Sequence, residues 1–197
     1  MDLIKKISKE RLWTFGDSFT FGYMCEPGYE YFDMFPPKKI WPELLSEYMG
    51  FELKNISEPG LSNHDITKNL ITNLKDIKKG DMVIVSDSSP FRLLSFKKED
   101  LNWKNIFMPD YEDKVVVDYL HQEILPYEES WTNYNREIVE SLFESLKETD
   151  CHYWSWKLRD KFESIREHTN DKIIDDHWSW NGHLQFYEFI KGVINVG

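Results

Sequence analysis

Apolar residues recur along the chain with two spacings, one typical of β-strands and one typical of helices. Four short runs that are continuously apolar or alternate predict strands, at 11–15, 51–56, 81–86 and 151–156. The run at 81–86 is rich in valine and isoleucine, which is typical of a strand buried on both faces of a parallel sheet. Helix-like segments separate the runs, so the pattern predicts right-handed βαβ units and a layered α/β/α domain.

Helical spacing of apolar residues marks four segments between and after the predicted strands. The second helix should begin at Ser62, because Ser62 to Asp65 resembles a capping box with Asp in place of the usual Glu or Gln. Gly80 lies just after the expected end of this helix. The last stripe predicts a terminal helix that covers the sheet. The four helices are expected at 40–50, 62–77, 128–148 and 184–194.

Three stretches show neither the strand-like nor the helix-like spacing of apolar residues. Residues 23–39 are rich in proline, glycine and aromatic side chains and predict an irregular loop. Residues 94–127 predict an irregular insertion, which is either functional or contains helices that the pattern does not resolve. Residues 157–170 are charged and are expected to form a short helix or a loop. No linker, repeat or low-complexity tract divides the chain, so residues 1–197 are expected to form a single domain.

Composition narrows the classes of partner. Apolar residues make up 41% of the chain and aromatic residues 16%, which is typical of a sequence that folds around a core. The 35 acidic residues outnumber the 24 basic ones and give a net charge of -11, which disfavours binding to nucleic acid. No apolar run reaches the roughly 18 residues of a membrane span, and the first ten residues lack the core of a signal peptide. We therefore expect a cytoplasmic protein without a membrane span.

The two cysteines, Cys25 and Cys151, show no spacing typical of a disulfide framework or a zinc site. His177 and His183 are six residues apart, and this spacing places them on no shared helix face. We expect no metal and no cofactor, and we interpret His183 as a packing residue at the start of the last helix.

The most informative stretch is the turn that follows the first predicted strand, Gly16-Asp17-Ser18. Ser18 should lie at the carboxyl edge of that strand, which is where ligands bind in an open α/β sheet. Asp and Ser are also common helix caps, so the turn taken alone favours a cap for the next element over a catalytic role.

A second short segment offers a base for a serine nucleophile. A serine hydroxyl needs a general base to take its proton, and the base works best when a carboxylate orients it. Asp175 and Asp176 directly precede His177 in a predicted loop before the last helix, so one segment could deliver both groups to the sheet edge.

Taken together, these blocks resemble those of the SGNH (GDSL) hydrolase superfamily over residues 12 to 190. The blocks are Gly16 to Gly22, Gly60-Leu61-Ser62-Asn63, and Asp175-Asp176-His177 with Gly182-His183. The resemblance implies a flavodoxin-like α/β/α fold, Ser18 as nucleophile and His177 as general base. Most members place the acid three residues before the histidine, where this chain has Ile174, so Asp175 is the candidate and Asp176 the fallback.

The resemblance also implies an oxyanion hole, and one part of it differs here. The hole would use the backbone N–H groups of Ser18 and Gly60 and an asparagine from a Gly-x-Asn-Asp block after the third strand. This chain has Ser86-Asp87-Ser88-Ser89 at that place, so Ser88 is the nearest candidate donor, and Asn63 is an alternative. Asp87 would oppose a developing negative charge. Loss of one donor costs about a hundred- to thousandfold in rate.

The sequence therefore predicts a serine esterase that acts on a small-molecule ester without a cofactor. If tryptophans such as Trp178 and Trp180 line the pocket, an acylated sugar becomes the favoured substrate, although tryptophans at such positions more often belong to the core. The altered third block favours a different class, a catalytically weak SGNH-like module for binding or assembly. An O-acyltransferase that uses the same triad is a further alternative.

Overall fold

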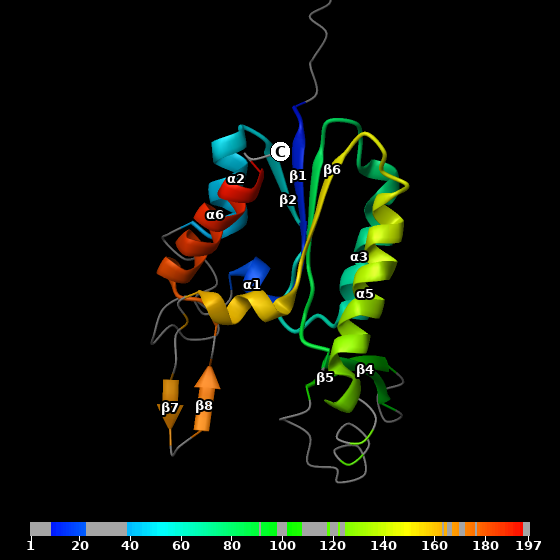
Figure 1. Cartoon of the computed structure of the whole chain (residues 1–197), viewed down its shortest axis with the longest axis vertical. Coiled ribbons are helices and arrows are strands. Elements are labelled where there is room, and N and C mark those ends of the chain that lie inside the picture. Colours follow the sequence, from blue (N-terminus) through cyan, green and yellow to red (C-terminus); the bar gives the residue numbers. More distant parts are fainter. Residues whose placement is uncertain are drawn as a thin grey trace, which may run out of the picture.

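In a computed structural model of the chain, a parallel sheet lies between two layers of helices (Figure 1). The structure describes residues 9–22, 39–90, 92–97, 102–107, 118, 122, 125–162, 164, 167–169, 172–175 and 177–194. The strands are β1 (Arg11–Phe15), β2 (Glu52–Asn55), β3 (Met82–Ser86), β4 (Arg92–Lys97), β5 (Asn102–Phe107), β6 (Asp150–Trp154), β7 (Glu167–Thr169) and β8 (Lys172–Asp175). The helices are α1 (Ser18–Phe21), α2 (Trp41–Met49), α3 (Asn63–Asn73), α5 (Glu128–Phe143) and α6 (Trp180–Ile194), with 3-10 turns η1 (Leu74–Asp76), η4 (Leu125–Tyr127) and η5 (Trp156–Lys161).

The central sheet has the strand order β2-β1-β3-β6, and all three pairings are parallel. This is the order in which flavodoxin-like sheets begin, with the switch point between β1 and β3. The predicted α/β class with a parallel sheet is confirmed, and all four predicted strands and all four predicted helices are present. The predicted loop at 23–39 lies outside the described residues except for its last position.

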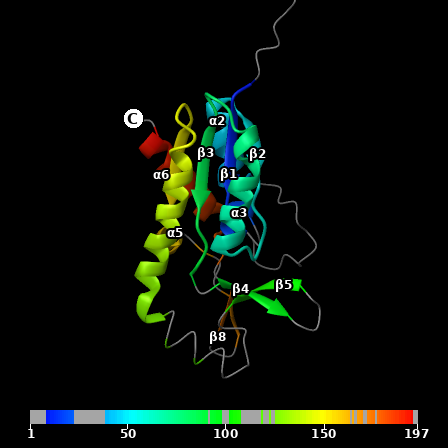
Figure 2. The same ribbon diagram turned by 90° about the vertical axis from the view of Figure 1, so that its right-hand side faces the viewer.

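Alternation along β1 and β3 creates two separate cores. Trp13 and Phe15 of β1 pack with α3 and α5, whereas Leu12 packs with α2 and α6 on the opposite face. Figure 1 shows α2 and α6 on one side of the sheet and α3 and α5 on the other, and Figure 2 shows α3 and α5 in front of the sheet. Because successive side chains of a strand point to opposite faces, the near-continuous apolar runs of β1 and β3 supply both cores at once.

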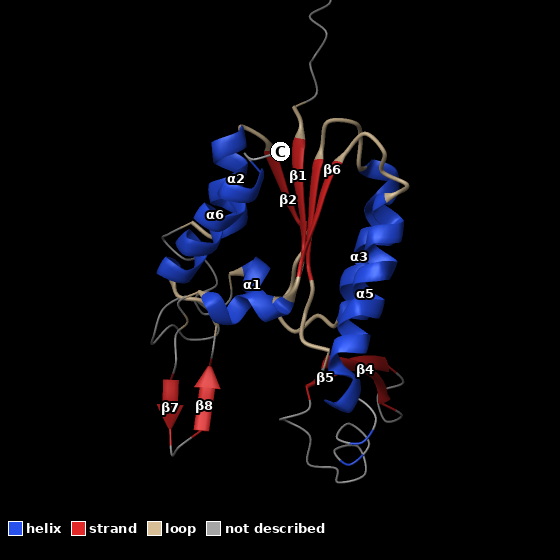
Figure 3. Ribbon diagram, viewed as in Figure 1, coloured by secondary structure: helices blue, strands red, loops and turns tan. Residues whose placement is uncertain are grey.

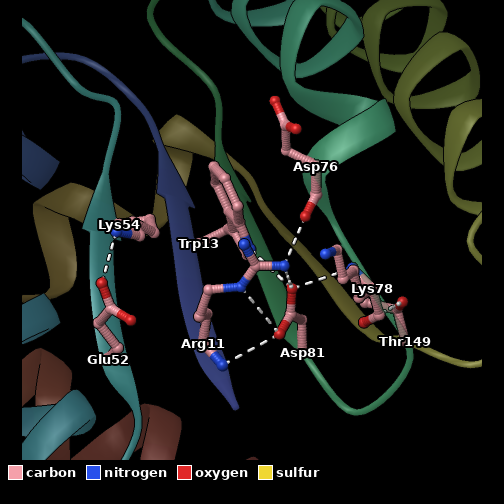
Figure 4. Close-up of polar contacts among 8 residues, drawn as sticks. All are labelled: Arg11, Trp13, Glu52, Lys54, Asp76, Lys78, Asp81 and Thr149. Carbon is pink, nitrogen blue, oxygen red and sulfur yellow. Dashed lines mark hydrogen bonds and ion pairs between the residues drawn. The ribbon is translucent and has the colours of Figure 1, made fainter. Parts of the chain in front are cut away.

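A buried carboxylate joins β1 and β3 at the amino edge of the sheet (Figure 4). Asp81 is 4% exposed and accepts hydrogen bonds from Trp13 Nε1 at 2.9 Å, Lys78 N at 3.0 Å and Arg11 Nη2 at 2.6 Å. Burial alone would raise the pKa of Asp81, but the hydrogen bonds from Arg11, Lys78 and Trp13 outweigh it and lower the pKa overall. This network fixes the edge of the sheet opposite to the one where ligands would bind.

Two antiparallel hairpins lie beyond the carboxyl edge of the sheet (Figure 3). The β4–β5 hairpin begins two residues before the predicted insertion at 94–127 and occupies its first part, so the expectation of irregular structure or helices is wrong there. The β7–β8 hairpin precedes α6, so Asp175 ends a strand, whereas a loop was expected there. Among the described residues, no helix has the length and apolar character needed to cross a membrane.

Candidate active site

Ser18 lies at the carboxyl edge of β1, where the chain turns into the short helix α1. Gly16 permits this turn, because a Cβ atom there would lie 2.2 Å from Thr20 Oγ1. Asp17 is the N-cap of α1, and its carboxylate accepts the backbone N–H of Phe19 at 3.1 Å. Ser18 is 2% exposed, and its hydroxyl forms no hydrogen bond within the described part of the chain. Asp17 therefore acts as the cap, and the hydroxyl of Ser18 is not used for capping.

Asp17 also connects the Gly-Asp-Ser turn to the loop after β3. The hydroxyl of Ser88, which is buried, donates to Asp17 Oδ2 at 2.9 Å. The guanidinium of Arg92 lies 3.4 Å from the same oxygen, and its Nη1 also donates to the carbonyl of Leu61 at 3.4 Å. In this arrangement the hydroxyl of Ser88 is directed at a carboxylate. Its role as an oxyanion donor stays a prediction.

Asn63, the alternative donor, holds the backbone of the same loop. Its side-chain Oδ1 accepts the N–H of Ser88 at 2.6 Å, and its Nδ2 donates to the carbonyl of Ser88 at 2.9 Å. Gly60 lies in the turn after β2 with a φ of +86°, a conformation that favours glycine. Both sides of the Asn63 amide are thus engaged in joining the start of α3 to the loop after β3.

His177 lies next to the turn that holds Ser18. Its ring stacks on Phe19, with the ring centroids 5.1 Å apart, and Trp178 meets the same phenylalanine edge to face at 5.2 Å. No hydrogen bond joins Ser18 to His177 in this arrangement. The side chain of Asp175 and all of Asp176 lie outside the described residues. The structure therefore brings the candidate base beside the residue that follows the candidate nucleophile.

His183 is a packing residue, as the sequence indicated. It is 1% exposed in the first turn of α6 and meets the ring of Trp178 edge to face at 5.5 Å. Burial lowers its pKa to about 3, and the nearby His177 lowers it further in the same direction. His183 is therefore neutral at physiological pH.

Asp87 has a partner that the sequence did not reveal. The hydroxyl of Tyr153 donates to its Oδ2 at 2.6 Å, and the backbone N–H of Trp156 donates to its Oδ1. Burial raises the pKa of Asp87 to about 7, and the charge of Asp17 adds to this, against the opposing effect of the two hydrogen bonds. Asp87 is thus partly protonated near neutral pH, which weakens the repulsion that it would exert on a developing oxyanion.

In the part of the chain that the structure describes, other reactive groups form no second centre. Burial raises the pKa of the Cys151 thiol to about 11, so this cysteine is a poor nucleophile at neutral pH. Within the described residues, no group of three His, Cys, Asp or Glu side chains is arranged to hold a metal ion. Of the tryptophans, Trp13, Trp41 and Trp178 belong to the two cores.

Several solved structures are similar to this chain. A protein of the G-D-S-L family from Desulfitobacterium hafniense DCB-2, described as lipolytic, is 16% identical with a TM-score of 0.43, and the match covers 93% of this chain and 98% of that one. Est24, a carbohydrate acetylesterase from Sinorhizobium meliloti, is 8% identical with a TM-score of 0.44 over 96% of this chain and 100% of that one. The aryl esterase of M. smegmatis is 11% identical with a TM-score of 0.39 over 93% and 99% of the two chains. No protein-family model and no curated protein matches the sequence.

Proposed function

We propose that this protein is a serine ester hydrolase of the SGNH (GDSL) type that cleaves small-molecule esters. Support comes chiefly from the hydroxyl of Ser18, which is buried at the carboxyl edge of β1 and has no hydrogen-bond partner within the described residues. A buried polar group without a partner carries a free-energy cost, and a catalytic role is one explanation for such a group. Ser18 is free for chemistry because Asp17 caps α1 in its place.

In the proposed reaction, Ser18 Oγ attacks the ester carbonyl while His177 accepts the hydroxyl proton. The tetrahedral intermediate then collapses, and His177 gives the proton to the leaving alcohol, which yields an acyl-enzyme. A water molecule, deprotonated by His177, attacks the acyl carbonyl and releases the carboxylic acid and free Ser18. Asp175, two residues before the histidine, would orient the imidazole.

The oxyanion would be stabilised by the backbone N–H groups of Ser18 and Gly60. As the first residue of a helix, Ser18 has an N–H without an intrahelical acceptor, so this donor suits the role. The hydroxyl of Ser88 is held by Asp17, and we expect a hole with two backbone donors to be slower by about a hundred- to thousandfold than one with a third donor.

A second candidate function is that of a catalytically weak module for binding or assembly. Two observations favour it, the engagement of Ser88 and Asn63 in hydrogen bonds within the protein and the lack of a Ser18–His177 hydrogen bond. An O-acyltransferase that uses the same residues is distinguished from a hydrolase by the addition of sugar acceptors to the assay.

The test is the reaction of wild-type protein and of Ser18→Ala with p-nitrophenyl acetate and with a fluorophosphonate probe. We expect the wild type to hydrolyse the ester and to be labelled on Ser18, and Ser18→Ala to do neither. Ser57→Ala is the matched control, because Ser57 is also buried and its hydroxyl also lacks a partner among the described residues. Full activity in Ser18→Ala would exclude the proposed nucleophile, and an unlabelled, inactive wild type would favour the binding module.

A further inference from the structure

A cavity of about 250 Å³ lies on the α3 and α5 side of the sheet, and neither Asp17 nor Ser18 is among its described lining residues. Pockets for drug-sized ligands measure roughly 300 to 1,000 Å³, so this one is the size for a molecule with a single ring. It is lined by Ser62, Asn63, His64, Thr67, Pro90, Arg92, Trp131, Tyr134, Asn135 and Ile138. Figure 2 shows the two helices side by side above the β4–β5 hairpin, which Arg92 begins.

Two aromatic side chains of α5 form an exposed corner of this cavity. Trp131 is 46% exposed and Tyr134 is 59% exposed, although large aromatic side chains are costly to leave in water. Their ring centroids are 6.3 Å apart, and the planes meet at 85°. A ligand ring that enters the corner would stack on one aromatic face and meet the other ring edge to face, which are the two favourable geometries.

The charge of the lining is opposite to that of the whole chain. The protein carries a net charge of -11 with 35 acidic residues, yet none of the described residues that line the cavity is acidic, and Arg92 carries a positive charge. Asp65, in the first turn of α3, is not part of the lining and has its carboxylate hydrogen-bonded by the Ser62 hydroxyl at 2.7 Å. An anion is therefore favoured over a cation in this cavity, because Arg92 is the charged side chain among the described lining residues.

Polar groups at the cavity are able to adjust to a ligand. Asn135 accepts from Thr67 Oγ1 at 3.5 Å and donates to the hydroxyl of Tyr153 at 3.4 Å, and both bonds are long. Arg92 contacts Asp17 Oδ2 and the carbonyl of Leu61, each at 3.4 Å, and both contacts are also long. A carboxylate is a suitable partner for a guanidinium, because the two groups match in planar geometry.

We infer that this cavity binds a small carboxylate that carries one ring. The ring lies against Trp131 and Tyr134, and the carboxylate faces Arg92. Binding at the cavity requires no reaction at Ser18, so this site goes beyond the proposed esterase. A ring-bearing carboxylate is also the chemical class of product that the esterase would release from an ester with a ring-bearing acyl group.

The test is calorimetric titration of the Ser18→Ala protein with three probes, benzoate, benzamide and acetate. Benzamide keeps the ring without the charge, and acetate keeps the charge without the ring. We expect benzoate to bind at least tenfold more tightly than either of the others. Equal binding of benzamide would overturn the role of charge, equal binding of acetate would overturn the role of the ring, and no measurable benzoate binding at millimolar concentration would overturn the site.

Variants connect the binding to the named side chains. Trp131→Ala removes an exposed side chain and should weaken benzoate binding about tenfold, whereas Tyr48→Ala, an equally exposed aromatic on α2, should leave it unchanged. Arg92→Gln should weaken the binding of benzoate but not that of benzamide. Arg92→Lys should retain part of the preference for benzoate over benzamide. Since all titrations use protein without the Ser18 hydroxyl, the result is independent of whether the protein hydrolyses esters.

Discussion

Replacing Ser88 with alanine separates two roles for its hydroxyl. In the structure this hydroxyl donates to Asp17 Oδ2 at 2.9 Å, and both residues are at most 3% exposed. A hydrogen bond to a charged group contributes about 1.5 to 3 kcal/mol, and Asp17 would keep the Phe19 N–H and the contact with Arg92. We therefore expect Ser88→Ala to lower the free energy of unfolding by about 2 kcal/mol.

The same variant should have little effect on catalysis. Loss of a true oxyanion donor lowers the rate about a hundred- to thousandfold, whereas loss of a hydroxyl that only supports Asp17 should change kcat for p-nitrophenyl acetate by less than about tenfold. Urea unfolding and initial rates measure the two effects on one preparation. Ser57→Ala serves as control, since its hydroxyl has no partner to lose among the described residues. A hundredfold fall in kcat with unchanged stability would refute our assignment and place Ser88 in the oxyanion hole.

Two further predictions concern buried carboxylates and pH. Because the pKa of Asp87 is raised to about 7 in the folded protein, its ionisation opposes folding, and the stability of the wild type relative to Asp87→Asn should fall by up to about 4 kcal/mol as the pH rises from about 4 to above 7. Parallel stability curves of the two proteins from pH 4 to 8 would contradict this. The pKa of Asp81 is lowered in the folded protein, so the charged carboxylate adds to the free energy of unfolding above about pH 4, and this stabilisation is lost at lower pH. Asp81→Asn should lower the free energy of unfolding by about 3 kcal/mol at pH 7, because it leaves Arg11 and Trp13 without their acceptor. This deficit, measured by urea unfolding, should shrink below pH 4, and a deficit that is constant with pH would count against the role of the Asp81 charge.

The parts of the fold that the sequence predicts are those whose signal is local. The runs at β1 and β3 are apolar on both faces because each face meets a layer of helices, and this requirement is visible without knowledge of the partners. The hairpins β4–β5 and β7–β8 are different, because they lie outside the central sheet and their strands alternate poorly between apolar and polar residues. The formation of such an antiparallel pair depends on which two segments of the chain pair with each other, and composition does not reveal this pairing.

The candidate site likewise contains residues that local motifs predict and contacts that only the folded chain creates. Ser18, Gly60 and His177 lie in short blocks that the sequence presents as motifs. Arg92 belongs to no motif, and its contact with Asp17 joins residues 75 positions apart along the chain. Asn63 lies in one of the blocks, but its bonds to the backbone of Ser88, 25 residues further on, are not visible in the sequence. The hydrogen bond from Tyr153 of β6 to Asp87, in the loop directly after β3, likewise depends on the parallel pairing of β3 and β6.

The two interpretations of the Gly-Asp-Ser turn, cap and nucleophile, prove to be compatible. An N-cap residue uses a side-chain oxygen to accept a backbone N–H of the helix. Asp17 has this role here, because its carboxylate accepts the N–H of Phe19. Had Ser18 been the cap, its oxygen would accept a backbone N–H and would be directed into the helix. Because the cap lies one residue earlier, Ser18 begins α1 at the edge of the sheet, and its hydroxyl has no hydrogen-bond partner among the described residues. Capping by Asp17 is therefore a condition for the proposed nucleophile, and the Ser88 and Arg92 contacts to Asp17 hold both in place.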